Sequence, residues 1–248
     1  MKRNGLSGCG EVLKVQPDCL ICQDSGFIHP IIDGRVVYGQ VVRCVCKTES
    51  DNRSRQQAML RYCQLPELTK TLDNFDVSGA KILGEALKSA WQIVNGELIF
   101  LTLGSHSNRG KSHLAKGICL EWLKRGVPAR YGFVPDLLAE LKDGFDLEGE
   151  DSHMQRMGRL LDVPLLVLDD LGTEKFTDWG LEVIQRIINH RYEHQLPLVV
   201  TTNRAIDELA GTRTAEERMA SQRIASRLRR EEWSKVLFIE APSFKRKE

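Results

Sequence analysis

From residue 80 onward, segments with helical spacing of apolar residues alternate with short, continuous apolar runs. The apolar runs lie at 97–103, 128–134, 164–168, 196–201 and 235–239. The periodicity predicts helices at 80–95, 112–125, 135–142, 154–161, 177–193 and 215–232. The acidic stretch 143–152 is expected to form a loop. Buried strands that alternate with helices predict an α/β fold with a five-stranded parallel sheet covered on both faces.

The first 65 residues lack this alternation. Residues 35–43 alternate well enough to form one half of a small hairpin, and residues 50–63 are polar and compatible with a helix. We therefore expect three parts in the chain. They are an N-terminal module at 1–50, a linker helix at 51–65 and the α/β domain at 66–248.

Composition supports a soluble, globular protein. Of the 248 residues, 42% are hydrophobic and 28% are charged, and the net charge is only +1. Bulk coating of nucleic acid by positive charge is therefore excluded, although a local patch is not. No apolar run approaches the roughly 20 residues that span a bilayer, and no apolar core follows Lys2 and Arg3. We expect no membrane contact, a cytoplasmic location and reduced cysteines.

Residues 104–112 read Gly-Ser-His-Ser-Asn-Arg-Gly-Lys-Ser and lie between a predicted strand and a predicted helix. Backbone N–H groups at such a junction point toward an anion, and the helix N-terminus favours negative charge. Lys111 would reach the terminal phosphates of a nucleotide, and the Ser112 hydroxyl would bind Mg²⁺. Gly-Lys-Ser alone fits an ordinary strand-to-helix turn equally well. The flanking elements and the acidic motif below favour a nucleotide site.

The spacing within this loop is unusual. Four residues ordinarily separate the first glycine from Gly-Lys-Ser, and here Ser105 occupies that glycine position while Gly104 lies one residue earlier. Asn adopts the left-handed conformation more readily than most residues, so we expect Asn108 to let the loop turn. The candidate nucleotide-binding residues are Gly104, Ser105, His106, Ser107, Asn108, Arg109, Gly110, Lys111, Ser112, His113 and Asp169.

Two later apolar runs end in polar residues that complete a hydrolytic site. Asp169 and Asp170 follow the run at 164–168, and Asn203 follows the run at 196–201. Open parallel sheets bind ligands at the carboxyl ends of their strands. Asp169 is suited to hold Mg²⁺, Asp170 to act as general base toward water, and Asn203 to sense the γ-phosphate. Each motif alone also fits a polar strand end, and together they favour catalysis.

An arginine-rich helix is predicted near the C-terminus. Arg223, Arg227 and Arg230 fall at i, i+4 and i+7 and share a face, with Ile224 and Leu228 turned toward the core. A solvated amphipathic helix explains any single arginine. An arginine finger that completes the ATP site of a neighbouring subunit is the functional alternative.

Cysteines cluster before residue 47. Cys19 and Cys22 form one pair, and Cys44 and Cys46 form a second. Four thiolates in two close pairs suit a tetrahedral structural zinc, and a small module has too little core to fold well without a metal. A redox pair or a chance cluster is the alternative. Cys9 and His29 are substitute ligands, and Cys63 and Cys119 are expected to be buried thiols.

The order of these motifs resembles a known family. Gly-Lys-Ser-His-Leu-Ala, Val-Leu-Asp-Asp-Leu-Gly, Leu-Val-Val-Thr-Thr-Asn and Arg-Ile-Ala-Ser-Arg-Leu look like the corresponding segments of the DnaC/DnaI helicase loaders. Those proteins are AAA+ ATPases close to the IstB transposition helpers. The resemblance covers roughly residues 66–245. The cysteine pairs are similar to the zinc module of DnaI-type loaders, whose N-terminal domain contacts the helicase.

The resemblance implies a P-loop NTPase of the AAA+ class. Only nine residues follow the last predicted strand, so we expect it to lack the C-terminal helical lid of many AAA+ proteins. By this likeness, Lys111 and Ser112 belong to the Walker A motif, and Asp169 and Asp170 to the Walker B motif. Asn203 corresponds to sensor 1, and Lys245 is the nearest match to sensor 2. Arg227 is the candidate arginine finger, with Arg223 as second choice. The implied cofactors are ATP, Mg²⁺ and Zn²⁺.

The function implied by the resemblance is ATP-dependent loading of a hexameric replicative helicase onto DNA. Its partners would be that helicase, single-stranded DNA and a second copy of the chain, bound through the Arg227 face. Two alternatives stay open. One is an IstB-like transposition helper that binds DNA and a transposase, and the other is a non-hydrolysing adaptor whose irregular loop has lost ATP binding.

Overall fold

The computed structural model describes residues 18–32, 34–37, 40–172, 176–212, 214–230 and 232–243. Contacts divide the chain into two compact units, Met1–Arg55 and Gln56–Glu248. The borders expected at residues 50 and 65 remain predictions. None of the helices in these described ranges is long and apolar enough to cross a membrane.

The first unit contains two short antiparallel ribbons. Strand β1 (Phe27–Ile28) pairs with β4 (Val42–Arg43), and β2 (Ile31–Ile32) pairs with β3 (Arg35–Val36). Residues 35–36 do form one half of a small hairpin, with β2 as the other half, but 42–43 pair with β1, so 35–43 is not one continuous half of a hairpin as expected. The Cys44 N–H donates to the Gly26 carbonyl at 2.9 Å, which brings β4 to β1 instead.

Helix α1 (Val45–Cys63) contains the border between the units. It begins earlier than the linker helix expected at 50–63, directly after Cys44. Cys46 therefore lies in its first turn. The early start is explained by the cysteine-rich turn, because the Lys47 and Thr48 N–H groups both donate to the Cys44 carbonyl at 3.1 Å.

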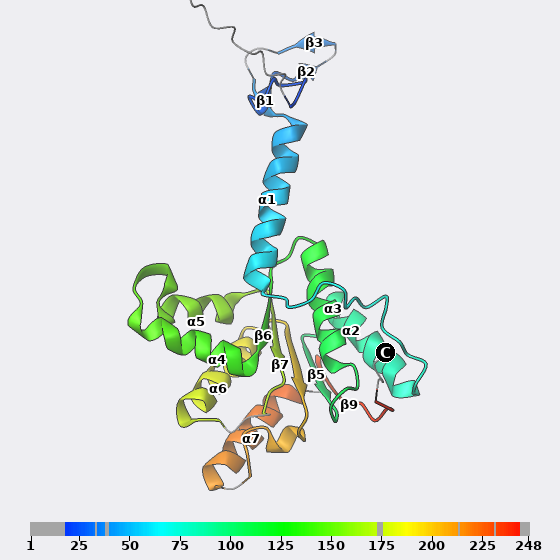
Figure 1. Cartoon of the computed structure of the whole chain (residues 1–248), viewed down its shortest axis with the longest axis vertical. Coiled ribbons are helices and arrows are strands. Elements are labelled where there is room, and N and C mark those ends of the chain that lie inside the picture. The colour runs from blue at the N-terminus through cyan, green and yellow to red at the C-terminus, as the bar shows by residue number, and fades with distance from the viewer. Residues whose placement is uncertain are drawn as a thin grey trace, which may run out of the picture. The chain divides into compact units, whose positions relative to one another are not determined.

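The second unit is built on a five-stranded parallel sheet, as the sequence predicts (Figure 1). The strand order is β6-β7-β8-β5-β9. The strands are β5 (Phe100–Gly104), β6 (Ala129–Phe133), β7 (Leu165–Asp169), β8 (Leu198–Thr202) and β9 (Ser234–Phe238). Every neighbouring pair is parallel, so all five carboxyl ends lie at one edge.

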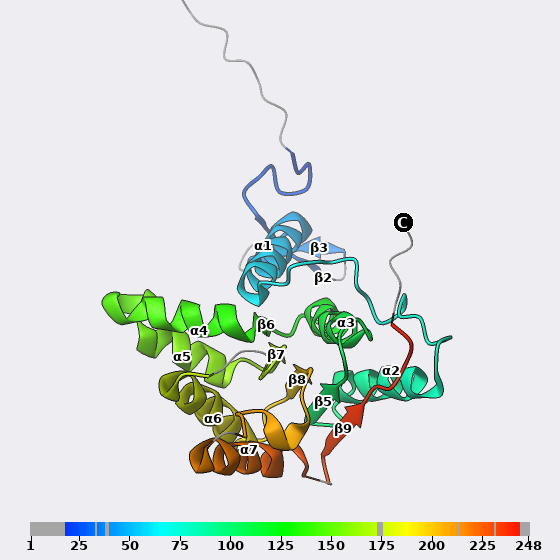
Figure 2. The same cartoon turned by 60° about the horizontal axis from the view of Figure 1, so that its bottom comes forward.

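Side chains alternate between the two faces of this sheet. One face, with Leu101 and Val167, packs against α2 (Lys81–Val94) and α3 (Lys111–Lys124). The other face, with Leu168 and Val200, packs against α4 (Val134–Asp143), α5 (His153–Asp162), α6 (Asp178–Glu193) and α7 (Ala215–Leu228). Figure 2 shows the sheet between these two layers. The prediction that helices cover both faces is confirmed.

Two further segments depart clearly from expectation. The acidic stretch 143–152 contains two 3₁₀ turns, η1 (Gly144–Asp146) and η2 (Gly149–Asp151), so it is not simply a loop. Helix α7 ends at Leu228 instead of residue 232. The chain has to turn there because the Trp233 carbonyl already accepts the Ile99 N–H at 2.8 Å, just before β9 begins.

A buried arginine ties together the starts of two strands. Arg191 on α6 is fully buried. Its guanidinium donates to the Val163 carbonyl at 2.8 Å and to the Pro197 carbonyl at 2.7 Å. It also reaches the carbonyls of Leu160, Leu161 and Pro164. These bonds hold the segments that lead into β7 and β8.

Residues 66–76, which we call the strap, lie against α3. Leu72 of the strap is buried, and a Cβ on Gly117 of α3 would come within 2.9 Å of the Leu72 backbone nitrogen. The Lys116 ammonium also lies 3.5 Å from the Glu67 carboxylate. The close approach requires glycine at position 117, because any Cβ there would collide with backbone.

Candidate functional site

The predicted phosphate loop, the acid pair and Asn203 all follow strand ends at one edge of the sheet. Strands β5, β7 and β8 end at Gly104, Asp169 and Thr202. Gly104 is paired with Thr202 in the parallel register. The three motifs, which are far apart in the sequence, therefore meet at the carboxyl edge, as expected.

The loop turns through left-handed residues. Asn108 has φ 61°, as its residue type predicts, and Gly110 has φ 88° immediately before α3. Gly104 serves a different purpose, because a Cβ there would lie 2.8 Å from a ring carbon of Phe238 on β9. Packing against β9 therefore accounts for a glycine at position 104. Ser105 is buried, and His106, Ser107 and Asn108 are exposed.

Lys111 is buried at the start of α3 and surrounded by acceptors. Its ammonium donates to the Asn203 side-chain oxygen at 2.8 Å and to the Ser105 hydroxyl at 2.9 Å. It also donates to the carbonyls of Ser105 and His106, at 3.1 and 3.2 Å. Burial lowers the pKa of Lys111, while the charges of Asp170 and Asp169 oppose that shift.

Asn203 connects Lys111 to the second acid. While its oxygen accepts from Lys111, its amide nitrogen donates to Asp170 Oδ1 at 2.6 Å. Asp170 has φ 64°, and its N–H donates to the Thr201 hydroxyl at 2.9 Å. The ends of β7 and β8 are thus joined by hydrogen bonds that hold the Asp170 carboxylate and the Asn203 amide in place.

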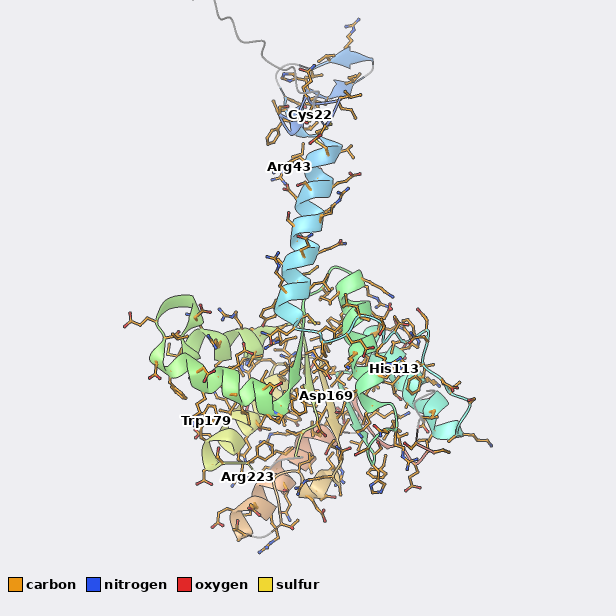
Figure 3. All side chains as sticks on the ribbon, viewed as in Figure 1. Cys22, Arg43, His113, Asp169, Trp179 and Arg223 are labelled. Atoms are coloured by element: carbon orange, nitrogen blue, oxygen red, sulfur yellow. The ribbon has the colours of Figure 1, made fainter. Side chains whose placement is uncertain are left out.

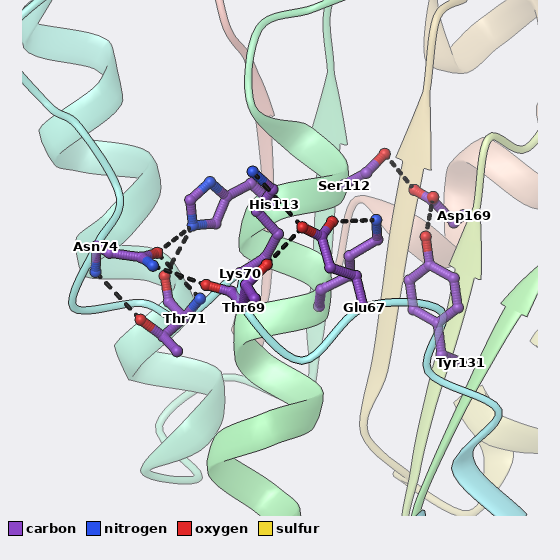
Figure 4. A network of polar contacts seen from close by, with 10 residues as sticks. Glu67, Thr69, Lys70, Thr71, Asn74, Ser112, His113, Tyr131 and Asp169 are labelled. Carbon is purple, nitrogen blue, oxygen red and sulfur yellow. Dashed lines mark hydrogen bonds and ion pairs between the residues drawn. The ribbon is translucent and has the colours of Figure 1, made fainter.

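Asp169 accepts hydrogen bonds from three hydroxyl groups. Ser112 donates to its Oδ1 at 3.0 Å and Thr201 to the same oxygen at 2.5 Å. Tyr131 on β6 donates to Oδ2 (Figure 4). Hydroxyl and carboxylate oxygens are the ligands that Mg²⁺ prefers, so Ser112 and Asp169 fit the ion. Thr201 and Tyr131 were not predicted as site residues, and the run Thr-Thr-Asn is the sequence signal that points to Thr201.

His113 has a different set of partners. Its Nε2 lies 2.8 Å from both the Thr71 carbonyl and the Asn74 side-chain oxygen, and its ring meets Phe75 edge-on. Burial lowers the pKa of His113, so the neutral ring donates from Nε2 to these two acceptors. The structure therefore places this predicted nucleotide-binding side chain against the strap (Figure 4).

Helix α7 carries two of the three predicted arginines, Arg223 and Arg227, whereas Arg230 lies beyond its end at Leu228 and does not share the helix as predicted. Ile224 and Leu228 are buried, while Arg223 is exposed (Figure 3). Arg227 is half-buried, with its guanidinium 5.8 Å from the centre of the Tyr192 ring and a hydrogen bond to the Arg223 carbonyl at 3.1 Å. Lys245 lies outside the described residues.

The four predicted cysteine ligands come together in the first unit. The Sγ atoms of Cys19, Cys22, Cys44 and Cys46 all lie within 4.8 Å of one another. Cys19 and Cys44 are 3.8 Å apart, and Cys22 and Cys46 are 3.4 Å apart. Tetrahedral Zn²⁺ with Zn–S bonds of about 2.3 Å needs sulfur atoms about 3.8 Å apart, so the cluster fits zinc.

His29 and the remaining cysteines that the structure describes, Cys63 and Cys119, are not part of this cluster. The His29 ring contacts the Gln40 carbonyl at 2.8 Å, and His29 is not among the clustered residues. Cys63 and Cys119 are buried, which confirms that expectation. Cys9 falls outside the described residues.

Comparison with known proteins identifies the family. The model of the family "IstB-like ATP binding protein" matches residues 32–248. The chain belongs to this family. It is 25% identical to the replicative helicase loader DnaI of Bacillus subtilis, over 98% of this chain and 81% of DnaI. It is 29% identical to the replicative helicase loader DnaC of Escherichia coli, over 58% of this chain and 57% of DnaC.

A solved structure supports the same assignment. The crystal structure of the DnaC helicase loader matches 73% of this chain and 99% of its own, with a TM-score of 0.56 and 26% identity. The chain therefore has the AAA+ fold and is an ATP-binding P-loop protein of the IstB and DnaC type. The resemblance to DnaC/DnaI loaders is confirmed at the level of the family.

Proposed function

We propose that this IstB-like protein hydrolyses ATP and uses it to load a hexameric replicative helicase onto DNA. The observation that carries the proposal is the convergence of Lys111, Ser112, Asp169, Asp170 and Asn203 at one sheet edge. The likeness to DnaI along nearly the whole chain supports the loading role. The cysteine cluster in the first unit also favours a loader over a transposition helper.

Each residue of the edge has a task in phosphoryl transfer to water. The loop N–H groups and Lys111 would bind the β- and γ-phosphates, and Ser112 and Asp169 would hold Mg²⁺, which neutralises phosphate charge. Asp170 would accept a proton from the attacking water. Asn203, fixed between Lys111 and Asp170, would orient that water against the γ-phosphate.

The remaining parts supply the partners. The zinc module formed by Cys19, Cys22, Cys44 and Cys46 would hold the helicase. Arg227 would complete the ATP site of a second copy of the chain, with Arg223 as the alternative. Arginines of the same helix would contact single-stranded DNA, and hydrolysis would release the loader from the helicase.

Titration with a fluorescent ATP analogue tests the enzyme claim. Wild type should bind, and Lys111→Ala should not, because it loses the buried ammonium. Lys124→Ala, at the exposed far end of the same helix, is the matched control and should bind normally. Asp170→Asn should bind nucleotide but release no phosphate. Failure of wild type and Lys111→Ala alike to bind nucleotide would favour the non-hydrolysing adaptor, whose loop has lost ATP binding. Binding without phosphate release by wild type, even with DNA and helicase present, would contradict the hydrolysis that we propose.

Capture of a helicase tests the loading role. Tagged protein should retain the purified replicative helicase of the same host or phage, and the Cys19→Ser/Cys22→Ser variant should not. Retention of a transposase with no helicase bound would contradict the proposal and support the IstB-like alternative, for which the family description gives independent support.

A further inference from the structure

The side chain of Tyr131, on β6, is long enough to reach the Asp169 carboxylate at the end of β7. In the register of β6 and β7, Tyr131 is opposite Val167 and Phe133 is opposite Asp169. Tyr131 and Asp169 therefore point to the same face, two positions apart along the strands. That offset is about 7 Å, the length of a tyrosine side chain, so the phenol reaches Asp169 Oδ2 (Figure 4).

The Tyr131 hydroxyl is buried beside the carboxylate to which it donates. Tyr131 is 6% exposed and its ring packs in the apolar layer beneath α3. A buried phenol needs a hydrogen-bond partner, and here the partner is a carboxylate. A carboxylate oxygen can only accept, so the Tyr131 hydroxyl is the donor to Asp169 Oδ2.

The three hydroxyls on Asp169 are not equivalent. Ser112 and Thr201 share Oδ1, whereas Tyr131 donates to Oδ2. Ser112 is itself the hydroxyl that the proposed function assigns to Mg²⁺. Thr201 is also occupied on its other side, where it accepts the N–H of Asp170. Of these three hydroxyls, Tyr131 is the one that holds Oδ2, and it is not among the groups assigned to nucleotide or Mg²⁺.

We propose that Tyr131 is a positioning residue for the magnesium site, which orients the Asp169 carboxylate toward the ion. This role rests on the proposed nucleotide function. Hydrogen-bond partners of metal ligands change metal affinity by about 10–100-fold when removed. Tyr131→Phe keeps the ring and its packing and removes only the hydroxyl, so it isolates this effect.

The test measures binding of a fluorescent, non-hydrolysable ATP analogue with increasing Mg²⁺ and, separately, with EDTA. Mg²⁺ should strengthen binding of the analogue. In Tyr131→Phe, the Mg²⁺ concentration that gives half of the maximal gain in analogue affinity should rise about ten-fold. Affinity in EDTA should match wild type, because the phosphate loop is untouched. Tyr62→Phe is the matched control, since its hydroxyl donates to the Arg159 carbonyl at 3.0 Å in the same unit. It should leave Mg²⁺ dependence unchanged.

Three outcomes would overturn the inference. An unchanged Mg²⁺ requirement in Tyr131→Phe shows that the hydroxyl does not orient Asp169. An equal loss of affinity in Mg²⁺ and in EDTA, with a lower Tm, shows a structural role alone. In both cases wild type still binds nucleotide and the proposed function stands. If wild type binds no nucleotide in either condition, the proposed function itself is refuted and this inference with it.

Discussion

Replacing Gly117 with alanine tests how closely the strap approaches α3. A Cβ at this position would lie 2.7 Å from Leu72 Cδ2 and 2.9 Å from the Leu72 nitrogen, so the strap has to move. Alanine in a helix interior gains about 1 kcal/mol over glycine, while overpacking of about this severity costs about 2 kcal/mol. The net loss of about 1 kcal/mol should lower the Tm by about 3 °C.

Gly84→Ala on α2 is the matched control. Gly84 is exposed, and nothing lies within 4 Å of a Cβ placed there. This variant should raise the free energy of unfolding by about 1 kcal/mol, so the two variants should differ by about 2 kcal/mol. Thermal and urea unfolding followed by circular dichroism measure both. An equal rise in Tm for Gly117→Ala and Gly84→Ala would refute the close approach.

Two further predictions concern the cysteine cluster and His113. Purified wild type should carry one zinc per chain by elemental analysis, and Cys19→Ser/Cys22→Ser should carry none; a folded, metal-free wild type would contradict the zinc site. Burial holds the pKa of His113 below its ordinary value of 6.5, so the unfolded chain binds the proton more readily. The stability from neutral His113 is therefore complete above pH 6.5 and falls as pH drops toward the folded pKa. His113→Gln should make the decline of Tm below pH 6.5 less steep than in wild type. Equal slopes of Tm against pH for wild type and His113→Gln would contradict this role of His113.

The sheet could be predicted because its strands are continuous apolar runs. Parallel strands buried on both faces leave such runs, and β7 and β8 both match them closely. The short ribbons of the first unit could not be predicted in the same way. Alternation at 35–43 does not reveal pairing partners, and the Cys44–Gly26 hydrogen bond determines that β4 pairs with β1.

The order of motifs predicted the residues at the sheet edge, because each motif directly follows a strand. The position of Lys111, Asp170 and Asn203 at this edge can therefore be predicted from the amino-acid sequence alone. The contact of the Tyr131 hydroxyl cannot, since it depends on the register between β6 and β7. The partners of His113 are likewise hidden, because they come from the strap, which has no recognisable motif.

Arg191 has a consequence for the far end of the sheet. It bonds the segments before β7 and β8, and in the register of these strands Leu166 is opposite Leu198. The two strands bring Asp170 and Asn203 to the opposite edge, where the amide has to meet the carboxylate within 2.6 Å. By holding the segments just before their N-terminal ends, the Arg191 guanidinium thus helps to set how far β7 and β8 are shifted along each other. Slippage there would misalign Asp170 and Asn203, the proposed catalytic pair, without any change in the residues that we propose bind ATP.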